Sequence, residues 1–353
     1  MLKNLAKKHE ISLISLITHA SERQYIKYLA PFCREVIVAE RPEKPWTLTN
    51  ILKTGLGKYP FLVVRNFSPR AKEAVIKKLT DEHFDLIHAE TFYVMPHLPK
   101  TQIPTLLVEQ TIEYLVYQHF VDTLKYFFLK PFFAVDVNKI RYWEQFYWQQ
   151  ASRVVAMSQA DKDVMQSQVT NLNVSIIPNG VDVDFFKFKT RTKLHEPKVL
   201  FVGNFKWLQN REAVMALFTS IWPKIARTLP KAKLWIVGRF PSPEILQFRG
   251  DRIEVSDNIE DIRVAYEKSD VLLAPIYGPG GTRYKILEAM ASGLPVVTTP
   301  QGIEGLEVED GREALICRSS GDLAWATTKL LTDTKLYHAL AQAGNRFVRD
   351  KFN

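Results

Sequence analysis

Short apolar runs alternate with longer amphipathic stretches along the whole chain. Runs of four or five apolar residues, bounded by glycine, proline or charged residues, predict buried strands. Stretches in which apolar residues recur every three or four positions predict helices between them. Strand and helix in alternation are typical of a parallel sheet with helices on both faces. The predicted strands are 11–17, 35–39, 85–89, 105–108, 153–157 and 174–177 in the first half, and 198–202, 234–237, 252–255, 270–274 and 295–299 in the second.

The helical pattern is clearest at 22–33, 69–79 and 160–168, and again from Thr282 onward. An aromatic-rich helical region runs from the strand at 105–108 to about residue 150, and 46–58 reads as helix or loop. We find no internal repeat at a fixed period. The pattern therefore predicts an α/β protein built from two halves of similar architecture.

The most informative stretch is 278–300, where a glycine-rich turn, a helix and an apolar strand follow one another. Gly280 and Gly281 belong to a loop with almost no side chains. Thr282 suits the N-cap of the following helix, and Gly293 suits its end. The first N–H groups of such a helix lack intrahelical partners, so they and the helix dipole attract phosphate.

Charged residues near the start of this predicted helix extend the same interpretation. Arg283 and Lys285 add positive charge beside the loop, and Glu288 follows about one turn later. Cations suit a diphosphate, and a single carboxylate suits ribose hydroxyls. The stretch therefore predicts a nucleotide site.

Two other predicted strands of the second half also end in glycine with a cation beyond it. Gly203 follows 198–202, with Lys206 three residues later, and Gly238 follows 234–237 with Arg239 directly after it. Glycine at a strand end lets the backbone approach a ligand closely.

The residues from Lys285 to Val297 resemble the K-x-x-E-A-M-A-x-G-x-P-V-V signature of glycosyltransferase family 4, the retaining group 1 enzymes of the GT-B fold. The P-N-G-V-D string at 178–182 resembles the family's hinge between domains. The resemblance implies two Rossmann-like domains facing each other across a cleft, with 1–178 binding the acceptor and 179–353 binding the nucleotide sugar. It also implies transfer of a sugar from a nucleotide-diphosphate sugar to an acceptor hydroxyl, and it gives Glu288 the role of holding the ribose. The family's turns equivalent to 203–206 and 238–239 face the donor, so the resemblance adds Gly203, Lys206, Gly238 and Arg239 to the predicted donor site.

The chain departs from the family pattern at two places. The family plan begins with a strand and a glycine-rich turn, whereas here a helix end at 2–6 leads into 11–17. We therefore expect the first domain to lack its first strand and that turn. The second departure is Gly280, at a position where the family often has a second glutamate.

Catalytic candidates in the first half come from the same resemblance. The string DLIHAET resembles a D-x-x-H-x-H strand whose second histidine lies near the reacting sugar, and that position is Glu90 here, with His88 at the first. Glu90 and His88 are therefore the catalytic candidates, although packing also explains a single strand histidine. Glu109 and Glu113 are weaker candidates, because EQTIEY resembles an H-N-x-E-Y segment.

A metal site has one candidate, the Asp182-Val-Asp184 string, which imitates a D-x-D motif. Aspartates beside a turn more often cap it by accepting backbone hydrogen bonds. We interpret Ser158 in the same way, as the cap of the helix at 160–168. We therefore expect no essential metal and no cofactor besides the donor.

Composition indicates the class of protein and the cellular compartment. A chain of 353 residues, 46% hydrophobic and 24% charged, is typical of a soluble globular protein. Its two cysteines, Cys33 and Cys317, exclude a disulfide framework or a zinc site of cysteines, so a reducing, cytoplasmic setting is the default. No secretory signal and no apolar run of about 20 residues is present.

The net charge of +9 favours anionic partners. Nucleic acid ranks last because no nucleic-acid motif is present. Residues 124–133 (LKYFFLKPFF) combine aromatics with lysine, which suits a membrane interface, but a core helix is the favoured interpretation. The expected partners are a nucleotide-diphosphate sugar, a glycan or lipid-linked acceptor in polysaccharide or glycolipid synthesis, and the inner face of a membrane.

Two other functions remain open on the sequence. A nucleotide-sugar epimerase or phosphorylase would share the fold, and a degenerate, inactive transferase would bind nucleotide without turnover. A dinucleotide oxidoreductase is disfavoured because no G-x-G-x-x-G follows a strand.

Overall fold

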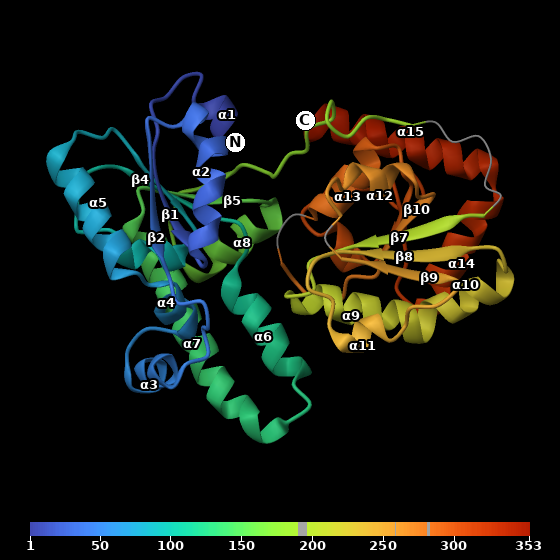
Figure 1. Ribbon diagram of the computed structural model, residues 1–353, viewed down its shortest axis with the longest axis horizontal. Helices are drawn as coiled ribbons and strands as arrows, with labels where there is room; N and C mark the ends of the chain where they lie inside the picture. Colours follow the sequence, from blue (N-terminus) through green and yellow to red (C-terminus); the bar gives the residue numbers. More distant parts are fainter. Residues whose placement is uncertain (190–195, 258, 281–282) are drawn as a thin grey trace. The chain divides into compact units, whose positions relative to one another are not determined.

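The computed structural model describes the chain except for residues 190–195, 258 and 281–282. The chain divides into two compact units, Met1–Ile176 and Ile177–Asn353 (Figure 1). Each unit contains its own cluster of buried hydrophobic side chains. The two units are therefore described one at a time.

Within Met1–Ile176, all of which the structure describes, the strands form two parallel sheets. The first strand along the chain, β1, is preceded by the short helix α1, the order that the sequence indicates. Strands β1 and β2 pair with each other, and β3 to β6 lie side by side in chain order. The bounds are β1 (Ser12–Ile17), β2 (Glu35–Glu40), β3 (Ile87–Glu90), β4 (Thr105–Glu109), β5 (Arg153–Ala156) and β6 (Val174–Ile176).

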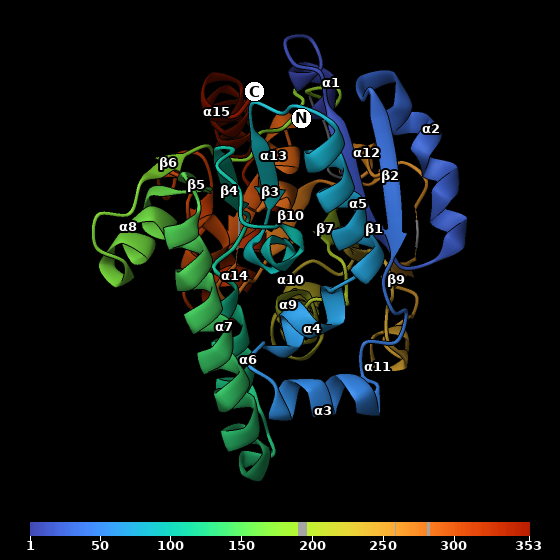
Figure 2. The ribbon, with the colours of Figure 1, turned by 90° about the vertical axis from the view of Figure 1, so that its left-hand side faces the viewer.

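The helices of the first unit differ from the sequence prediction at 22–33, at 61–66 and at 124–133. The predicted helix 22–33 is a chain of short helical turns in which Pro31, without an N–H group, occupies the last turn. Helix α4 was not predicted. Helix α5 packs against β1 and β2, as Figure 2 shows. The helices are α1 (Leu2–Leu5), α2 (Ile26–Leu29), α3 (Leu48–Leu56), α4 (Phe61–Asn66), α5 (Pro69–Asp81), α6 (Glu113–Thr123), α7 (Lys130–Gln150) and α8 (Gln159–Gln168).

The core-helix interpretation of 124–133 is wrong. Helix α7 begins only at Lys130, with Pro131 in its first turn, where a missing N–H group costs nothing. The aromatic residues before it connect α6 to α7 and are exposed, Phe127 most of all at 79%. The two helices pack along each other, and their connection forms the tip of a helical hairpin.

The described residues of the second unit form one parallel sheet of six strands, in the order β9-β8-β7-β10-β11-β12. Numbered along the chain, this is the 3-2-1-4-5-6 order of a Rossmann fold. The strands are short and almost wholly apolar because helices cover both faces of such a sheet. Their bounds are β7 (Lys198–Val202), β8 (Lys233–Val237), β9 (Ile253–Ser256), β10 (Val271–Ala274), β11 (Val296–Thr298) and β12 (Leu315–Ile316).

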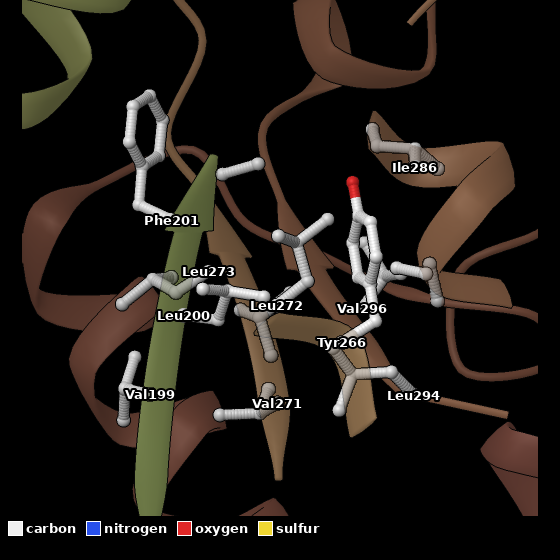
Figure 3. Close-up of a cluster of buried hydrophobic side chains, with 14 of the residues drawn as sticks. Val199, Leu200, Phe201, Tyr266, Val271, Leu272, Leu273, Ile286, Leu294 and Val296 are labelled. Carbon is white, nitrogen blue, oxygen red and sulfur yellow. The ribbon is translucent and has the colours of Figure 1, made fainter. Parts of the chain in front are cut away.

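Helices α13 and α14 both pack against β10 and β11, α13 together with α15 and α14 together with α10. Figure 3 shows the core that results, with Val199 and Leu200 of β7 beside Val271 and Leu272 of β10. None of the helices that the structure describes is long and apolar enough to cross a membrane. The helices are α9 (Leu208–Ala216), α10 (Trp222–Thr228), α11 (Pro243–Leu246), α12 (Arg263–Glu267), α13 (Tyr284–Ala291), α14 (Ser320–Thr332) and α15 (Thr334–Lys351).

Candidate functional site

The strand order of the second unit places a ligand crevice at one edge of its sheet. Strands β7 and β10 are neighbours, but the chain leaves β7 towards β8 on the other side. The segments that follow the two strands therefore diverge, and ligands of such sheets bind beyond the carboxyl ends at this point. The segments at that edge are 203–207 after β7 and 275–280 after β10.

The turn after β7 is packed backbone to backbone against the turn after β8. The N–H of Gly203 donates to the Val237 carbonyl at 2.9 Å, and that of Phe205 donates to the Arg239 carbonyl at 3.0 Å. A Cβ on Gly238 would lie 1.6 Å from the Gly203 carbonyl oxygen. Only glycine fits there, so the approach of these two turns depends on Gly238.

The two cations predicted beside these glycines lie on exposed turns at the same edge. Lys206 and Arg239 are both exposed. The Lys206 ammonium lies 3.8 Å from the centroid of the Phe240 ring. Phe240 has a φ of 62°, a conformation that bulky residues rarely adopt. The sequence does not predict Phe240, because nothing in the local pattern indicates its positive φ.

The glycine-rich loop after β10 is tied to the helix that follows β7. The Gln209 side chain, at the start of α9, donates to the Pro279 carbonyl at 2.8 Å. Gly280 has a φ of 131°, which residues with a side chain rarely adopt. The other two predicted loop residues, Gly281 and Thr282, lie outside the described residues.

Helix α13 begins later than the sequence pattern indicates. Its first residue is Tyr284, with Arg283 in the N-cap position, so the prediction that Thr282 caps the helix is wrong. The Arg283 guanidinium donates to the Gly278 carbonyl at 2.8 Å.

Lys285 reaches from α13 towards the β7 side of the crevice. Its ammonium donates to Asn210 Oδ1 at 2.6 Å and lies 4.5 Å from the centroid of the Phe201 ring. Burial, with the Arg283 charge nearby, lowers the pKa of Lys285 to about 7. An anion bound beside this amine would hold its proton in place, because the opposite charge favours the charged form.

Glu288 lies one turn further along α13 and is held by a buried tyrosine. The Tyr266 hydroxyl, on α12, donates to Glu288 Oε2 at 2.7 Å. Figure 3 shows the Tyr266 hydroxyl pointing towards the side of α13 that carries Ile286. Burial raises the pKa of Glu288, while the Tyr266 hydrogen bond and the Lys285 charge oppose that rise. Tyr266 was missed, because an isolated tyrosine in a short helix carries no signal.

The catalytic candidates of the first unit do meet each other. The His88 ring and the Glu90 carboxylate lie 3.0 Å apart at the carboxyl end of β3, and the Gln110 amide donates to Glu90 at 3.2 Å. Burial opposes ionisation of Glu90, but the hydrogen bonds from His88 and Gln110 outweigh it and lower the pKa of Glu90. Thr91, the next residue, has a φ of 71°, a strained conformation of the kind that concentrates at functional sites.

The weaker candidates Glu109 and Glu113 belong to a buried group of carboxyls. Glu109 accepts from the Trp148 indole at 3.0 Å, and burial raises its pKa to about 8. Burial also raises the pKa of Glu113, to about 7. Glu144 accepts from the backbone N–H of Glu113 at 2.7 Å and from that of Tyr114 at 3.0 Å, so it caps the start of α6.

Glu144 was missed, although a signal exists. It occupies the buried, otherwise apolar face of α7 together with Ile140, Trp143, Tyr147 and Trp148. A carboxyl at a core position of a helix needs a partner, which here is the first turn of α6.

The capping interpretation is confirmed for Asp182 and for Ser158. Asp182 Oδ1 accepts from the N–H of Asp184 at 3.1 Å and from that of Phe185 at 2.8 Å. The Ser158 hydroxyl accepts from the Asp161 N–H at 3.1 Å, at the start of α8. Cys33 and Cys317 are both free thiols.

Two family models match the chain. Residues 196–333 match the model described as glycosyl transferases group 1. Residues 2–185, more than half of the chain, match the model of glycosyltransferase family 4. The chain belongs to glycosyltransferase family 4. As a member of this family it transfers a sugar from a nucleotide-sugar donor.

Relatives and solved structures agree with this assignment. The glycosyltransferase is 25% identical over 293 residues to a phosphatidyl-myo-inositol mannosyltransferase of Mycobacterium leprae, spanning 80% of this chain and 74% of that one. It resembles the structure of sucrose-phosphate synthase from Thermosynechococcus elongatus with a TM-score of 0.68 at 20% identity, covering 92% and 80% of the chains. It resembles Anabaena HepE in complex with UDP and glucose with a TM-score of 0.64 at 17% identity, covering 96% and 88%. These likenesses show the two-domain GT-B fold.

Proposed function

We propose that this glycosyltransferase binds a nucleoside-diphosphate sugar at the β7–β10 edge of its second unit and transfers the sugar with retention. The observation that carries the proposal is the arrangement on α13. Lys285 and Glu288 lie one turn apart at the switch point of the sheet, each held by a second residue, Asn210 and Tyr266. A cation and a carboxylate at that spacing suit a diphosphate and the ribose attached to it.

The cations of the edge would stabilise the leaving diphosphate. Its negative charge grows as the bond to the sugar breaks, and fixed positive groups lower the energy of that state. Lys285 suits the task because its pKa of about 7 rises when an anion binds. Arg283, Lys206 and Arg239 would contribute in the same way, as would the loop at Gly280.

We propose that these cations take the place of a metal. Asp182, the first aspartate of the D-x-D string, directs one carboxylate oxygen at two backbone N–H groups. That oxygen is engaged in a turn, which supports a structural role for the string.

On the acceptor side we propose Glu90, positioned by His88 and Gln110, as the residue beside the reacting sugar. Its lowered pKa keeps it ionised at neutral pH. An ionised carboxylate can accept a hydrogen bond from an acceptor hydroxyl.

The acceptor is proposed to be a glycan or a lipid-linked glycan, reached by the enzyme as a peripheral protein at the inner face of a membrane. The mycobacterial relative is named for a phosphatidyl-inositol acceptor, which supports a lipid-linked one here. Anabaena HepE, of the same fold, is described in complex with UDP and glucose, which supports a uridine nucleotide as the first donor to test.

The experiment is a thermal-shift screen against UDP, GDP and ADP, repeated on Glu288→Gln. A nucleotide at about 100 times its Kd stabilises the native state by about 2.7 kcal/mol, so we expect a rise in Tm of about 5–10 °C with one nucleotide. Glu288→Gln should lose most of that rise. Glu244→Gln, an exposed glutamate on α11 of the same unit, is the matched control and should keep it.

Turnover is then measured with the corresponding sugar nucleotide. The configuration of the anomeric carbon in the product, read by NMR, tests retention. An inverted product would refute retention alone, whereas no shift with any nucleotide would refute the donor site.

A further inference from the structure

Helix α3 turns its apolar side outward. Leu48, Ile51, Leu52 and Leu56 recur at helical spacing and form one side of the helix, which we term the α3 face. Their exposed fractions are 73%, 48%, 52% and 89%, whereas the buried residue of the helix is the polar Asn50. A helix of a globular protein normally buries its apolar stripe, so this face is suited to contact with something outside the first unit.

A second exposed apolar group lies at the tip of the α6–α7 hairpin. Tyr126, Phe127, Phe128 and Phe132, termed the hairpin tip, are exposed by 62%, 79%, 59% and 77%. Aromatic side chains of this size are seldom left in water as a group. The hairpin is held together beneath them by an edge-on contact of Phe120 with Phe133, whose ring centroids are 5.6 Å apart.

The α3 face and the hairpin tip belong to one end of the first unit. The Lys139 ammonium, on α7, donates to the carbonyls of Thr54 at 2.6 Å and Gly57 at 2.8 Å, which fastens the end of α3 to α7. Phe132 lies about 10 Å from Lys139 along α7, at 1.5 Å per residue. Figures 1 and 2 both show α3 beside the half of α7 that carries the tip.

Charge distinguishes the partners that could cover this surface. Residues 44–58 and 124–135 contain no Asp or Glu. A second copy of the chain would bring the same lysines against each other, which like-charge repulsion opposes. Aromatic and leucine side chains between lysines suit the interface of an anionic bilayer. The lysines of the two stretches are Lys44, Lys53, Lys58, Lys125 and Lys130.

A groove along α7, closed at one side by Lys58 after the end of α3, would accept a phosphate headgroup. It has a volume of about 550 Å³ and is lined by Lys58, Val135, Asn138, Lys139, Tyr142 and Trp143. An ammonium group has three N–H donors, and Lys139 directs two of them at the end of α3. The third, together with Lys58 at the rim, suits a phosphodiester.

We propose that the α3 face, the hairpin tip and the groove along α7 dock the first unit onto the headgroups of an anionic phospholipid bilayer. The leucines and aromatic rings enter the interface, and the lysines bind the lipid phosphates. This inference deepens the proposed peripheral attachment by naming the surface that performs it. It does not depend on the chemistry at the donor site.

The test is flotation of the full chain with vesicles. We expect the protein to float with vesicles of phosphatidylcholine and phosphatidylglycerol in equal parts, and to stay behind with phosphatidylcholine alone. Leu52→Asp and Leu56→Asp should each weaken partitioning about tenfold, because each removes a leucine from the interface. Lys53→Glu should weaken it about fivefold or more, because a lysine near an anionic surface contributes roughly that factor.

Two controls keep the outcome clear. Trp325→Asp alters an exposed aromatic residue of the second unit, 64% exposed, and should float like the original chain. All variants should keep their Tm and the UDP shift, because they lie outside the donor site. If none of UDP, GDP and ADP gives a shift while flotation behaves as expected, the donor proposal fails and the lipid-binding surface is still supported.

Three outcomes would overturn the lipid surface. The original chain could fail to float, or the α3 variants could float as well as it does. In the third, sedimentation would show a dimer that Leu56→Asp dissociates, and the α3 face would then be an interface between two copies.

Discussion

At the scale of single residues, α13 carries two ionisable side chains, Lys285 and Glu288, whose pKa values shift in opposite directions for the same physical reason. Burial lowers the pKa of Lys285 and raises that of Glu288, because it disfavours the charged form of each. Each is then held by a neutral partner, Asn210 or Tyr266. A buried charge without a partner is costly, so these partners are needed for the site to stay charged.

Tyr266 should act as a positioning residue for Glu288. Burial and the Glu288 charge hold the pKa of Tyr266 well above its ordinary value. The hydroxyl therefore stays protonated and donates a hydrogen bond to Glu288. Tyr266→Phe removes the donor and should weaken UDP binding about fivefold. It should also raise the pKa of Glu288, so UDP affinity should fall at a higher pH on the acid side. Calorimetric titration with UDP across the acid range measures both effects.

Tyr147→Phe is the control for this variant, since it removes a buried hydroxyl from the first unit. It should leave the affinity and its pH profile unchanged. An unchanged profile in Tyr266→Phe, with the Tm preserved, would mean that the hydrogen bond does not position Glu288.

At the scale of elements, the donor edge depends on how closely two turns approach. Strands β7 and β8 end in glycines whose backbones lie against each other, as the Gly203 and Gly238 geometry shows. Both glycines could be predicted, because glycine after a short apolar run is a strong local signal. Their mutual contact could not, because it joins residues 35 positions apart in the chain.

Gly238→Ala should separate the two turns. Its Cβ would meet a backbone oxygen at 1.6 Å, which cannot move without displacing β7. We expect a loss of about 1–3 kcal/mol of stability and a loss of the UDP shift. Gly250→Ala is the matched control, since a Cβ there meets nothing within 4 Å. Denaturant unfolding of both variants measures the difference, and equal stability would contradict the contact.

Strands were predicted more reliably than helix boundaries. Each predicted strand is present because a buried parallel strand is a nearly continuous apolar run. The helix predictions failed where aromatic residues face solvent, as at 124–133, and at the start of α13, which begins at Tyr284, two residues after the predicted start. Periodicity gives the spacing of apolar residues but not the side of the helix that meets the core.

At the scale of the whole molecule, the chain is two units with separate cores. Titration should affect them differently, because the first unit buries a group of carboxyls whereas α13 of the second unit combines a cation, Lys285, with a carboxyl, Glu288. The first unit contains the carboxyls Glu109, Glu113 and Glu144, whose pKa values burial raises. The second contains Lys285, whose pKa burial lowers.

The first unit should lose stability as pH rises. Below the ordinary carboxyl pKa of 4.5, Glu109 carries its proton in both the folded and the unfolded chain. In that range its titration does not change the free energy of unfolding. Between 4.5 and about 8 the unfolded chain has released the proton while the folded unit retains it, so the free energy of unfolding falls. Scanning calorimetry between about pH 5 and pH 8 should show its Tm decreasing.

Glu109→Gln should flatten that decrease, because glutamine does not titrate. Glu73→Gln, an exposed glutamate on α5, should leave it as it is. A Tm of the first unit that is independent of pH would show that Glu109 is ionised in the folded chain.

The sequence by itself determined the order of strands and helices, the family and the residues of α13, because these depend on local pattern and on neighbours within one turn. It also placed Glu90 beside His88, two residues apart on one face of a strand. Only the tertiary structure decided which side chains hold those residues and which faces stay exposed. Tyr266, Glu144 and the outward α3 face all depend on packing between segments far apart in the chain, which no local pattern encodes.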